Sequence, residues 1–310
     1  SDSIQKPYAE HATVYRAINA LSRNIARIPP EIFAKGSDNP LESHPLLKLF
    51  EQPNKLMRGT QLFEALTIDL ESWGNGIWWL GPTALVTRGQ RVPASIRRLD
   101  PCRIKVELDG NDEPLNYVYR RQSEDLKIPA AEIVHFKFWN PYDSKWGMSW
   151  TEPAQLEFDG DYAAMKWNRE FFINGAEPGG IFSAKDDHII TETAAERIRV
   201  QWINRHRNKA HEPMIVPSGA EFKSEGMGQK DMDFVNMRRY SRENTLSTSG
   251  MPPAIAGILE FANYANMAPQ IRLFFHLELL PRPTYIQSVI QSDLIERVGL
   301  NVDIYFKTEE

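Results

Sequence analysis

The sequence predicts an α+β fold in which an antiparallel sheet with helices occupies the first part of the chain and two long helices flank a small insert. Three observations predict it. Apolar and polar residues alternate in several stretches before residue 145, helical periodicity runs over 151–174 and 231–247, and Asn, Gly and Pro cluster at 174–180. With 310 residues, the chain is long enough for two compact domains or one elaborated domain.

The composition is that of a folded protein, with 42% hydrophobic and 25% charged residues. A formal charge of −5 argues against a dedicated sequence-specific DNA-binding protein, although local basic patches stay possible. The single cysteine, Cys102, allows neither an intramolecular disulfide nor a thiolate zinc site, and we expect it to be a small buried apolar residue. No apolar run approaches the roughly 20 residues that span a bilayer, so we expect no membrane partner.

The first element is a helix over residues 11–27. Its apolar residues Val14, Ile18, Leu21 and Ile25 recur at helical spacing and form one face, and two prolines end it.

A strand is expected at 31–34 and a short helix at 45–52, followed by a helix that begins near Thr60 as its N-cap. Strands follow at 76–80, 103–108, 115–120 and 132–139, and the turn "DGNDEP" makes the second and third of them a hairpin.

The next helix is expected over 151–174, with Thr151 as its cap and a length of about 36 Å. Leu156, Gly160, Ala163, Trp167 and Phe171 form a narrow stripe along it. Because the stripe carries small residues at its middle, we expect another element to pack closely at Gly160 and Ala163.

The insert, residues 176–228, reads as a compact α/β module. Its helix is expected to begin at Thr193, which forms a capping box with Glu196, and its strands lie around "GGIFSA", "PMIVP" and "AEFKSE". A loop rich in Gly, Pro and Asn is expected at 250–268. A long apolar helix then starts at Pro269, two prolines at 281 and 283 kink it, and "NVDIYF" closes the chain as a strand.

The sequence contains none of the short motifs of phosphate-binding loops, dinucleotide-binding folds, zinc proteases or serine hydrolases. The seven histidines are scattered, and none pairs at a spacing typical of a metal site. Two distant carboxylates could still form a glycosidase-type acid pair, so that alternative stays open. We predict no catalytic residue, no metal site and no cofactor.

Two basic segments stand out. The insert helix carries Arg205, Arg207 and Lys209, and these three residues form either a solvated face or a surface for nucleic acid or an acidic partner. The second long helix carries three more basic residues, Arg238, Arg239 and Arg242, for which pairing with carboxylates of the neighbouring long helix is the simpler alternative.

Several stretches, in order, resemble the portal proteins of tailed bacteriophages, in particular those of long-tailed phages and prophages. These are "ATVYRAINALSRNIARIPPEIF", "GMSWTEPA", "EFFINGAEPGGIF", "GMPPAIAG" and "NYANMAPQ". The most specific is "EFFINGAEPGGIF", which is similar to the family's exit from its first long helix. The chain departs from the family's pattern at Trp150, where Pro is usual, and at Ala265, where Ser is usual.

The resemblance implies a domain plan. A wing domain would comprise 1–150 and 269–310, stem helices 151–175 and 229–249, a clip 176–228 and a tunnel loop 250–268. The family's crown domain would be absent or truncated.

The resemblance also implies a function. The protein would be a non-enzymatic subunit of a twelve-membered ring at a capsid vertex, through which double-stranded DNA passes without sequence specificity during packaging and ejection. Its partners would be the terminase, the major capsid or scaffold protein and the head–tail adaptor. It would be assembled in the host bacterial cytoplasm and reside in the virion.

The resemblance implies site residues as well. Asn263, Tyr264 and Asn266 of the tunnel loop would project near the DNA, unless they only cap the following helix. Arg205, Arg207 and Lys209 would dock partners.

Two other functions stay open at this point. One is an α+β hydrolase whose insert acts as a lid, and the other is a ring-forming scaffold protein that does not conduct DNA.

Overall fold

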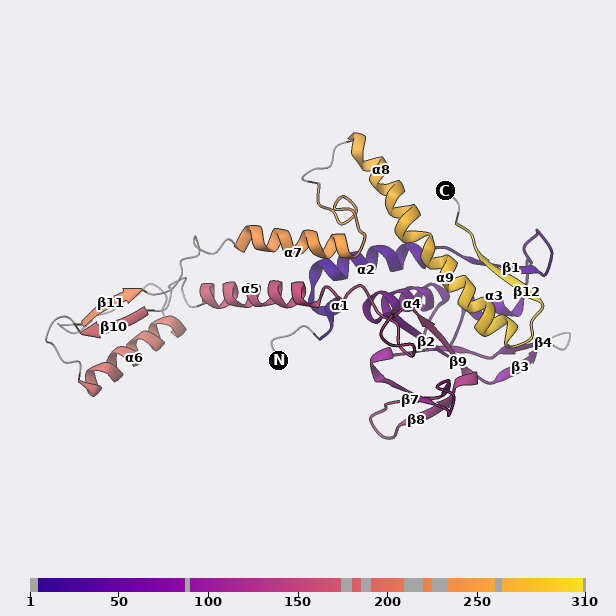
Figure 1. The fold of residues 1–310 in the computed structure, drawn as a ribbon, viewed down its shortest axis with the longest axis horizontal. Coiled ribbons are helices and arrows are strands. Elements are labelled where there is room, and N and C mark those ends of the chain that lie inside the picture. The colour runs from indigo at the N-terminus through magenta and orange to yellow at the C-terminus, as the bar shows by residue number, and fades with distance from the viewer. Residues whose placement is uncertain are drawn as a thin grey trace. The chain divides into compact units, whose positions relative to one another are not determined.

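The computed structural model describes residues 5–86, 90–173, 180–184, 191–208, 220–224, 234–259 and 264–308. The chain divides into two compact units, one formed by residues 157–242 and the other by 5–156 together with 243–310. The described chain contains both helices and antiparallel sheets, with β2 (Asn75–Leu80) to β9 (Ile133–Lys137) forming one run of strands (Figure 1), so the predicted α+β class is confirmed. The division falls within two helices, α5 (Gln155–Ile173) and α7 (Phe234–Thr248).

The larger unit contains most of the secondary structure. Its described helices are α1 (Pro7–Glu10), α2 (Ala12–Ile25), α3 (Pro45–Glu51), α4 (Gly59–Trp73), α8 (Tyr264–Phe274) and α9 (Pro281–Ile290). Its described strands are β1 (Pro30–Ala34), β2 (Asn75–Leu80), β3 (Thr83–Val86), β4 (Gln90–Pro93), β5 (Ile96–Leu99), β6 (Ile104–Leu108), β7 (Pro114–Tyr119), β8 (Leu126–Pro129), β9 (Ile133–Lys137) and β12 (Val302–Phe306).

Strand β2 is the centre of a three-stranded antiparallel sheet between β5 and β9, and in this register Trp78 lies opposite Arg98 and Val134. The expected hairpin is present as β6 and β7, and β8 extends it to a second sheet. Strands β1 and β12 pair, so the closing strand of the chain lies beside a strand near its beginning (Figure 1).

The predicted apolar face of α2 is confirmed, because Val14, Ile18, Leu21 and Ile25 are all fully buried. Around them, aromatic rings pack at the edges of one another, with Trp78 and Phe136 at a centroid distance of 4.8 Å. Burial of these rings adds to that of the Leu, Ile and Val side chains that make up most of the core.

Two helix starts differ from the prediction. Helix α4 begins at Gly59, and its Arg58 N–H donates to Gln61 Oε1 at 2.8 Å, so Thr60 is not the cap. Helix α5 begins at Gln155, so Thr151 lies four residues before its start and is not the cap; the Thr151 hydroxyl donates to the Ser72 carbonyl at 3.0 Å.

The long C-terminal helix starts earlier than expected. Residues from Tyr264 on are helical in α8, Pro269 lies inside that helix, and the predicted loop is therefore shorter. A π-helical turn over Phe275–Leu279 follows, in which the Leu280 N–H donates to the Phe275 carbonyl at 2.9 Å. This wider turn comes just before Pro281, whose ring would clash with a carbonyl in a regular α-helix. Figure 1 draws α8 and α9 as one continuous helical rod.

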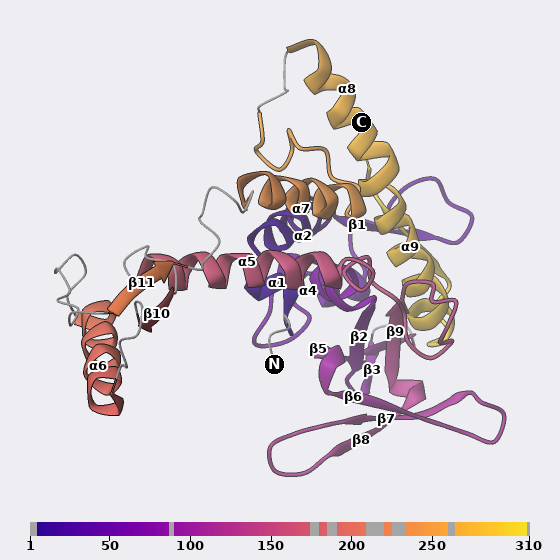
Figure 2. The same cartoon turned by 60° about the vertical axis from the view of Figure 1, so that its left-hand side comes forward.

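The smaller unit holds parts of the two long helices and the module between them. Strands β10 (Gly180–Ala184) and β11 (Ala220–Ser224) pair antiparallel, and α6 (Glu192–Asn208) lies beside them in both views (Figures 1 and 2). Thr191, not Thr193, caps α6, since its hydroxyl accepts the Ala194 N–H at 3.4 Å. The strand expected at 213–217 lies outside the described residues.

Within this unit, α5 and α7 run side by side (Figure 2). Arg238 pairs with Asp161 at 3.3 Å, and the Ser241 hydroxyl donates to the Glu157 carbonyl at 3.4 Å. The face of α5 toward α7 therefore carries Glu157 and Asp161 rather than the predicted stripe.

Cys102 is exposed, in contrast to the prediction. It follows β5 in a short turn, where Asp100 Oδ1 accepts its N–H at 3.1 Å. Burial of part of the thiol, together with the neighbouring Asp100 carboxylate, raises its pKa to about 11.

Candidate functional site

Four described segments of the larger unit meet around the guanidinium of Arg282. They are the end of α4, the residues just before α5, the turn that follows α7, and the long C-terminal helix. We call this cluster the Arg282 junction, and its members are Glu71, Ser149, Trp150, Thr151, Gly250, Glu278 and Arg282.

Arg282 binds two carboxylates at once. Its Nε and Nη2 donate to the two oxygens of Glu71 at 2.6 and 3.2 Å, and its Nη1 donates to Glu278 Oε2 at 3.0 Å. The Glu71 side chain is fully buried and that of Arg282 is 16% exposed. Burial by itself lowers the pKa of the guanidinium, but the Glu71 and Glu278 carboxylates outweigh it and hold that pKa above its ordinary value. The junction therefore holds a buried guanidinium hydrogen-bonded to two carboxyl groups.

The end of α4 is tied to the chain that leads into α5. The Ser149 hydroxyl donates to the Glu71 carbonyl, and the Thr151 hydroxyl donates to the Ser72 carbonyl. In addition, Trp150 Nε1 donates to Glu71 Oε2 at 3.0 Å. Because the last carbonyls of a helix lack partners within the helix, these side chains satisfy groups that burial would otherwise leave unpaired.

Gly250 ends α7 in a left-handed conformation, with φ of +68°. The Met251 N–H donates to the Leu246 carbonyl at 3.0 Å and the Gly250 N–H to the Ser247 carbonyl at 3.1 Å, which is a Schellman motif. A β-carbon at Gly250 would collide with the Glu278 carboxylate. Only glycine therefore allows both the turn and the close approach of Glu278.

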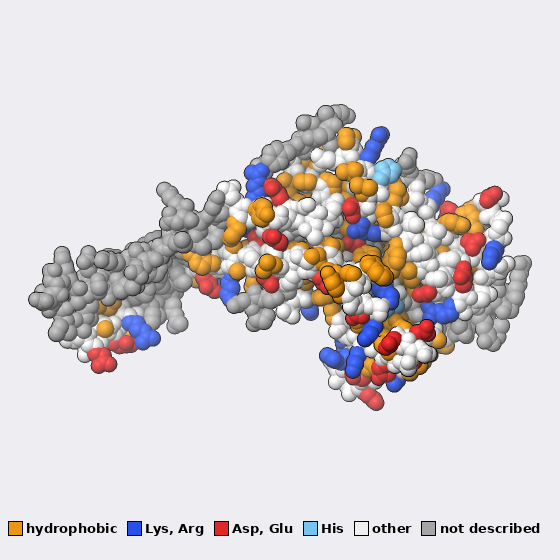
Figure 3. Space-filling model, in the orientation of Figure 1, with side chains coloured by type: hydrophobic (Ala, Val, Ile, Leu, Met, Phe, Trp, Pro, Cys, Tyr) orange, Lys and Arg blue, Asp and Glu red, His pale blue; other side chains and the backbone are white. Residues whose placement is uncertain are grey.

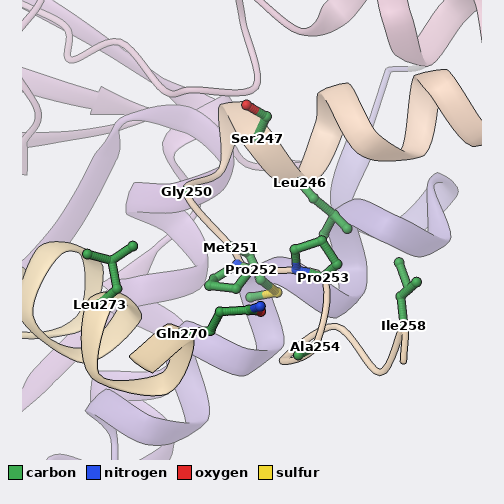
Figure 4. A pocket seen from close by; sticks show the side chains of 10 residues that line it. All are labelled: Leu246, Ser247, Gly250, Met251, Pro252, Pro253, Ala254, Ile258, Gln270 and Leu273. Carbon is green, nitrogen blue, oxygen red and sulfur yellow. The ribbon is translucent and has the colours of Figure 1, made fainter. Parts of the chain in front are cut away.

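A cavity of about 380 Å³ lies beside the junction, between the end of α7, the segment after it and α8 (Figure 4). Most of its described lining is apolar: Leu246, Ser247, Gly250, Met251, Pro252, Pro253, Ala254, Ile258, Gln270 and Leu273. Met251 is 2% exposed at its floor, whereas Leu273 is 57% exposed. The described lining offers no charged group for chemistry.

A second polar cluster holds the chain that precedes Ser149. Asn75 Oδ1 accepts the Gly147 N–H at 2.7 Å and lies 3.1 Å from His135 Nε2, while His135 Nδ1 lies 3.1 Å from the Tyr117 hydroxyl. An amide oxygen only accepts, so His135 Nε2 carries the proton and Nδ1 accepts from Tyr117. Burial, with a smaller effect of Lys137, lowers the pKa of His135 to about 3, so the ring is neutral.

The predicted stem residues lie on the two long helices, α5 and α7. Arg238, Arg239 and Arg242 all lie on α7, and the expected pairing with a carboxylate of the other long helix is confirmed for Arg238. Ala163 is exposed, and no atom lies within 4 Å of where a β-carbon of Gly160 would be. Close packing of a neighbour at Gly160 and Ala163 stays a prediction.

The other predicted residues are less fully described. Tyr264 and Asn266 lie in the first turn of α8, and Arg205 and Arg207 lie in α6. Asn263 and Lys209 lie outside the described residues. The structure thus gives the backbone of these sites and no side-chain contacts for them.

The sequence did not indicate the Arg282 junction. Glu71 looks like a surface residue of an amphipathic helix, and Arg282 lies between Pro281 and Pro283 with no carboxylate partner evident in the sequence pattern. A hint was present in "GMSWTEPA", where Ser149 and Thr151 are the hydroxyl donors, but their acceptors are far away in the sequence.

Over the part of the chain that is described, no group of three His, Cys, Asp or Glu side chains could hold a metal ion. Over the same part, no helix is both long and apolar enough to cross a bilayer. On the face shown in Figure 3, apolar and charged side chains are intermixed.

Comparisons with known proteins give a consistent result. A family model described as "Phage portal protein" matches residues 12–310. The probable portal protein of Streptomyces phage phiC31 is 24% identical over 261 residues, which cover 78% of this chain and 54% of that protein.

Two solved structures have a similar fold. One is a chain from the neck of a native gene transfer agent (GTA) particle computed with C12 symmetry, with a TM-score of 0.67, 23% identity and coverage of 97% of this chain and 82% of that chain. The other is an HK97 family phage portal protein from Corynebacterium diphtheriae, with a TM-score of 0.66, 14% identity and coverage of 97% and 93%.

Proposed function

The chain belongs to the phage portal protein family, and we propose that it is a portal subunit that forms a ring of twelve copies at a capsid vertex. Double-stranded DNA passes through this ring during packaging and ejection, without sequence-specific contacts. The observation that carries the proposal is the family match over residues 12–310. The fold likeness to a neck chain from a particle with C12 symmetry supports the ring. The family membership favours this function over the hydrolase alternative, and the proposal includes no enzymatic step.

We assign the parts of the ring subunit as follows. The wing comprises residues 1–150 and 269–310, the stem 151–175 and 229–249, and the clip 176–228. The tunnel loop is 250–268, shortened by the early start of α8 at Tyr264. The side-by-side pair of α5 and α7, with β10, α6 and β11 in the chain between them, supports the stem and the clip.

The exposed stripe on α5 is the proposed contact with the next copy in the ring. Leu156 is 83% exposed, and Gly160 and Ala163 are also exposed. Small residues allow a neighbouring backbone to approach closely, and an exposed apolar side chain beside them, here Leu156, is suited to a subunit interface.

The charge of the subunit fits a passage for DNA. Every phosphate that a protein neutralises adds affinity and drag. With a net charge of −5 on each subunit, a ring would attract DNA weakly and let it move. Asn263, Tyr264 and Asn266 are the proposed contacts near the DNA.

The clip residues Arg205, Arg207 and Lys209 are the proposed docking site for acidic surfaces of the terminase and the head–tail adaptor. The wing is the proposed contact with the major capsid or scaffold protein. The assembled ring resides in the virion and forms in the host bacterial cytoplasm.

Negative-stain images of the purified protein test the ring. We expect closed rings with a central hole wide enough for a DNA duplex. A preparation that stays monomeric at high concentration, and also in the presence of its capsid protein, would contradict the proposal.

Packaging assays test the passage and the docking. Deletion of residues 262–267 should leave rings intact and reduce the DNA packaged. Loss of folding instead would mean that this stretch only caps α8. Reversal of charge at Arg205 and Arg207 should weaken terminase binding, and unchanged binding and packaging would contradict the docking site.

A further inference from the structure

The Arg282 junction joins parts of the chain that are far apart in sequence. Glu71 and Arg282 are 211 positions apart, and Ser149 and Glu71 are 78 apart. Two of the joined segments flank the long helices α5 and α7. Residues 149–151 lie just before α5, and Gly250 lies just after α7; both segments belong to the larger unit.

The guanidinium of Arg282 is linked to both segments, each through one carboxylate. Through Glu71, Arg282 binds the helix end on which Ser149, Trp150 and Thr151 are hydrogen-bonded. Through Glu278, it fixes the carboxylate that fills the space over Gly250. The two acceptors are on different elements, so one side chain links the helix end that binds residues 149–151 to the carboxylate that packs against Gly250.

We propose that Arg282 is a positioning residue that sets the spacing between the segment before α5 and the segment after α7. The proposal rests on the proposed function in one respect, that α5 and α7 are the stem helices. It deepens that function by naming the side chain, Arg282, that links the segment before stem helix α5 to the segment after stem helix α7.

The chemistry of the junction requires arginine. A planar guanidinium with several N–H donors binds the two Glu71 oxygens side by side and still reaches Glu278, whereas an ammonium group is a point charge that cannot make this pattern. Arg282→Lys therefore keeps the charge and removes the geometry. Arg297 offers a matched control, since it follows the π-helical stretch Gln291–Glu296 that continues α9 but donates to the carbonyls of Ala130, Ala131 and Ile133.

The first test is hydrogen exchange of backbone amides in the purified, folded protein. In Arg282→Lys, the amides of Met251 and Ile258, which donate to Leu246 and Pro253, should exchange about tenfold faster or more. Amides of the β2–β9 ladder should keep their rates. Arg297→Lys should show the reverse, with faster exchange near β9 and no change at Met251.

The second test measures the spacing directly. Spin labels replace Glu152 and Thr248, both exposed, in a Cys102→Ser background, and labelled protein is diluted with unlabelled protein so that each ring holds one labelled copy. Pulsed electron paramagnetic resonance should give one narrow distance distribution with Arg282 and a broad or shifted one with Arg282→Lys. The Arg297→Lys variant should keep the narrow distribution.

A third variant addresses Glu278 and Gly250 together. Gly250→Ala should disturb the junction, and Glu278→Ala should remove the collision, so the double variant should lose less stability than the two single variants combined. Additive losses would show that the contact does not link these residues.

The proposal is overturned if Arg282→Lys lowers the unfolding midpoint while exchange at Met251 and the label distance stay unchanged, because the junction would then only stabilise the fold. These readouts do not depend on DNA passage. A protein that forms no rings but shows the expected exchange and distance changes would contradict the proposed function and leave the role of Arg282 standing.

Discussion

The neutral, buried His135 predicts how the stability of the larger unit depends on pH. The pKa of this ring is about 3 in the folded protein, against an ordinary value of 6.5. The unfolded chain therefore takes up a proton as the pH falls below 6.5, while the folded chain does not until about pH 3. The stability that the neutral ring contributes is present above pH 6.5 and is lost as the pH falls. At pH 5.0, 1.5 units below 6.5, the loss is about 2 kcal/mol at about 1.4 kcal/mol per unit.

Urea unfolding followed by tryptophan fluorescence measures this loss, because Trp146 lies 5.4 Å from the His135 ring. Wild type and His135→Gln are each measured at pH 7.5 and pH 5.0. The loss between the two pH values should be about 2 kcal/mol larger in wild type. Burial also raises the pKa of Asp69 to about 6, which acts in the opposite direction, but this effect is common to both proteins and cancels in the comparison. Equal losses in the two proteins would refute a neutral His135.

Three further predictions concern packing, backbone conformation and thiol reactivity. Phe136→Ala should lower the free energy of unfolding by about 3 to 5 kcal/mol, since the ring is fully buried. A loss below about 1 kcal/mol in urea unfolding would contradict this and mean that neighbouring side chains fill the cavity. Gly74→Ala should cost clearly more stability than Gly36→Ala. Both glycines have positive φ, but a β-carbon at Gly74 would lie 2.5 Å from the Met148 carbonyl carbon, whereas one at Gly36 would have no atom within 4 Å. Equal losses of stability in thermal unfolding would contradict the close contact of Gly74 with Met148. Cys102 should react with iodoacetamide at pH 8 much more slowly in the folded protein than in urea. A thiol pKa of about 11 leaves about a hundredfold less thiolate at this pH than a pKa of 9.0. Equal reaction rates would contradict the raised pKa.

Local sequence patterns predicted most of the elements of the larger unit. The apolar spacing in α2, the alternation in β6 and the turn that joins it to β7 depend on residues close together in the chain, and the structure contains all three. Element boundaries were less well predicted. The caps at Thr60, Thr151 and Thr193 were wrong, because α4 begins at Gly59, α5 at Gln155 and α6 at Glu192. The Thr151 hydroxyl is instead bonded to the Ser72 carbonyl, an acceptor that is distant in the sequence.

The start of α8 was also misplaced, because the Gly, Pro and Asn residues of 250–268 indicated a loop and Pro269 is typical of a first helical turn. The structure tolerates Pro269 inside a helix and a π-helical turn before Pro281. Since such turns depend on what the helix packs against, the sequence pattern could not show them.

By itself, the sequence determined the fold class, the positions of most helices and strands, and the resemblance to portal proteins that the family match confirms. These follow from hydrophobic periodicity and from motifs that are continuous in the chain. Only the tertiary structure decided which charged residues are buried and what they bind. Glu71 and Arg282 look like ordinary surface residues in sequence, and only the packing of α4 against the C-terminal helix removes them from water and joins them. Burying either charge without its partner would be strongly unfavourable, and that pairing is a property of the folded chain.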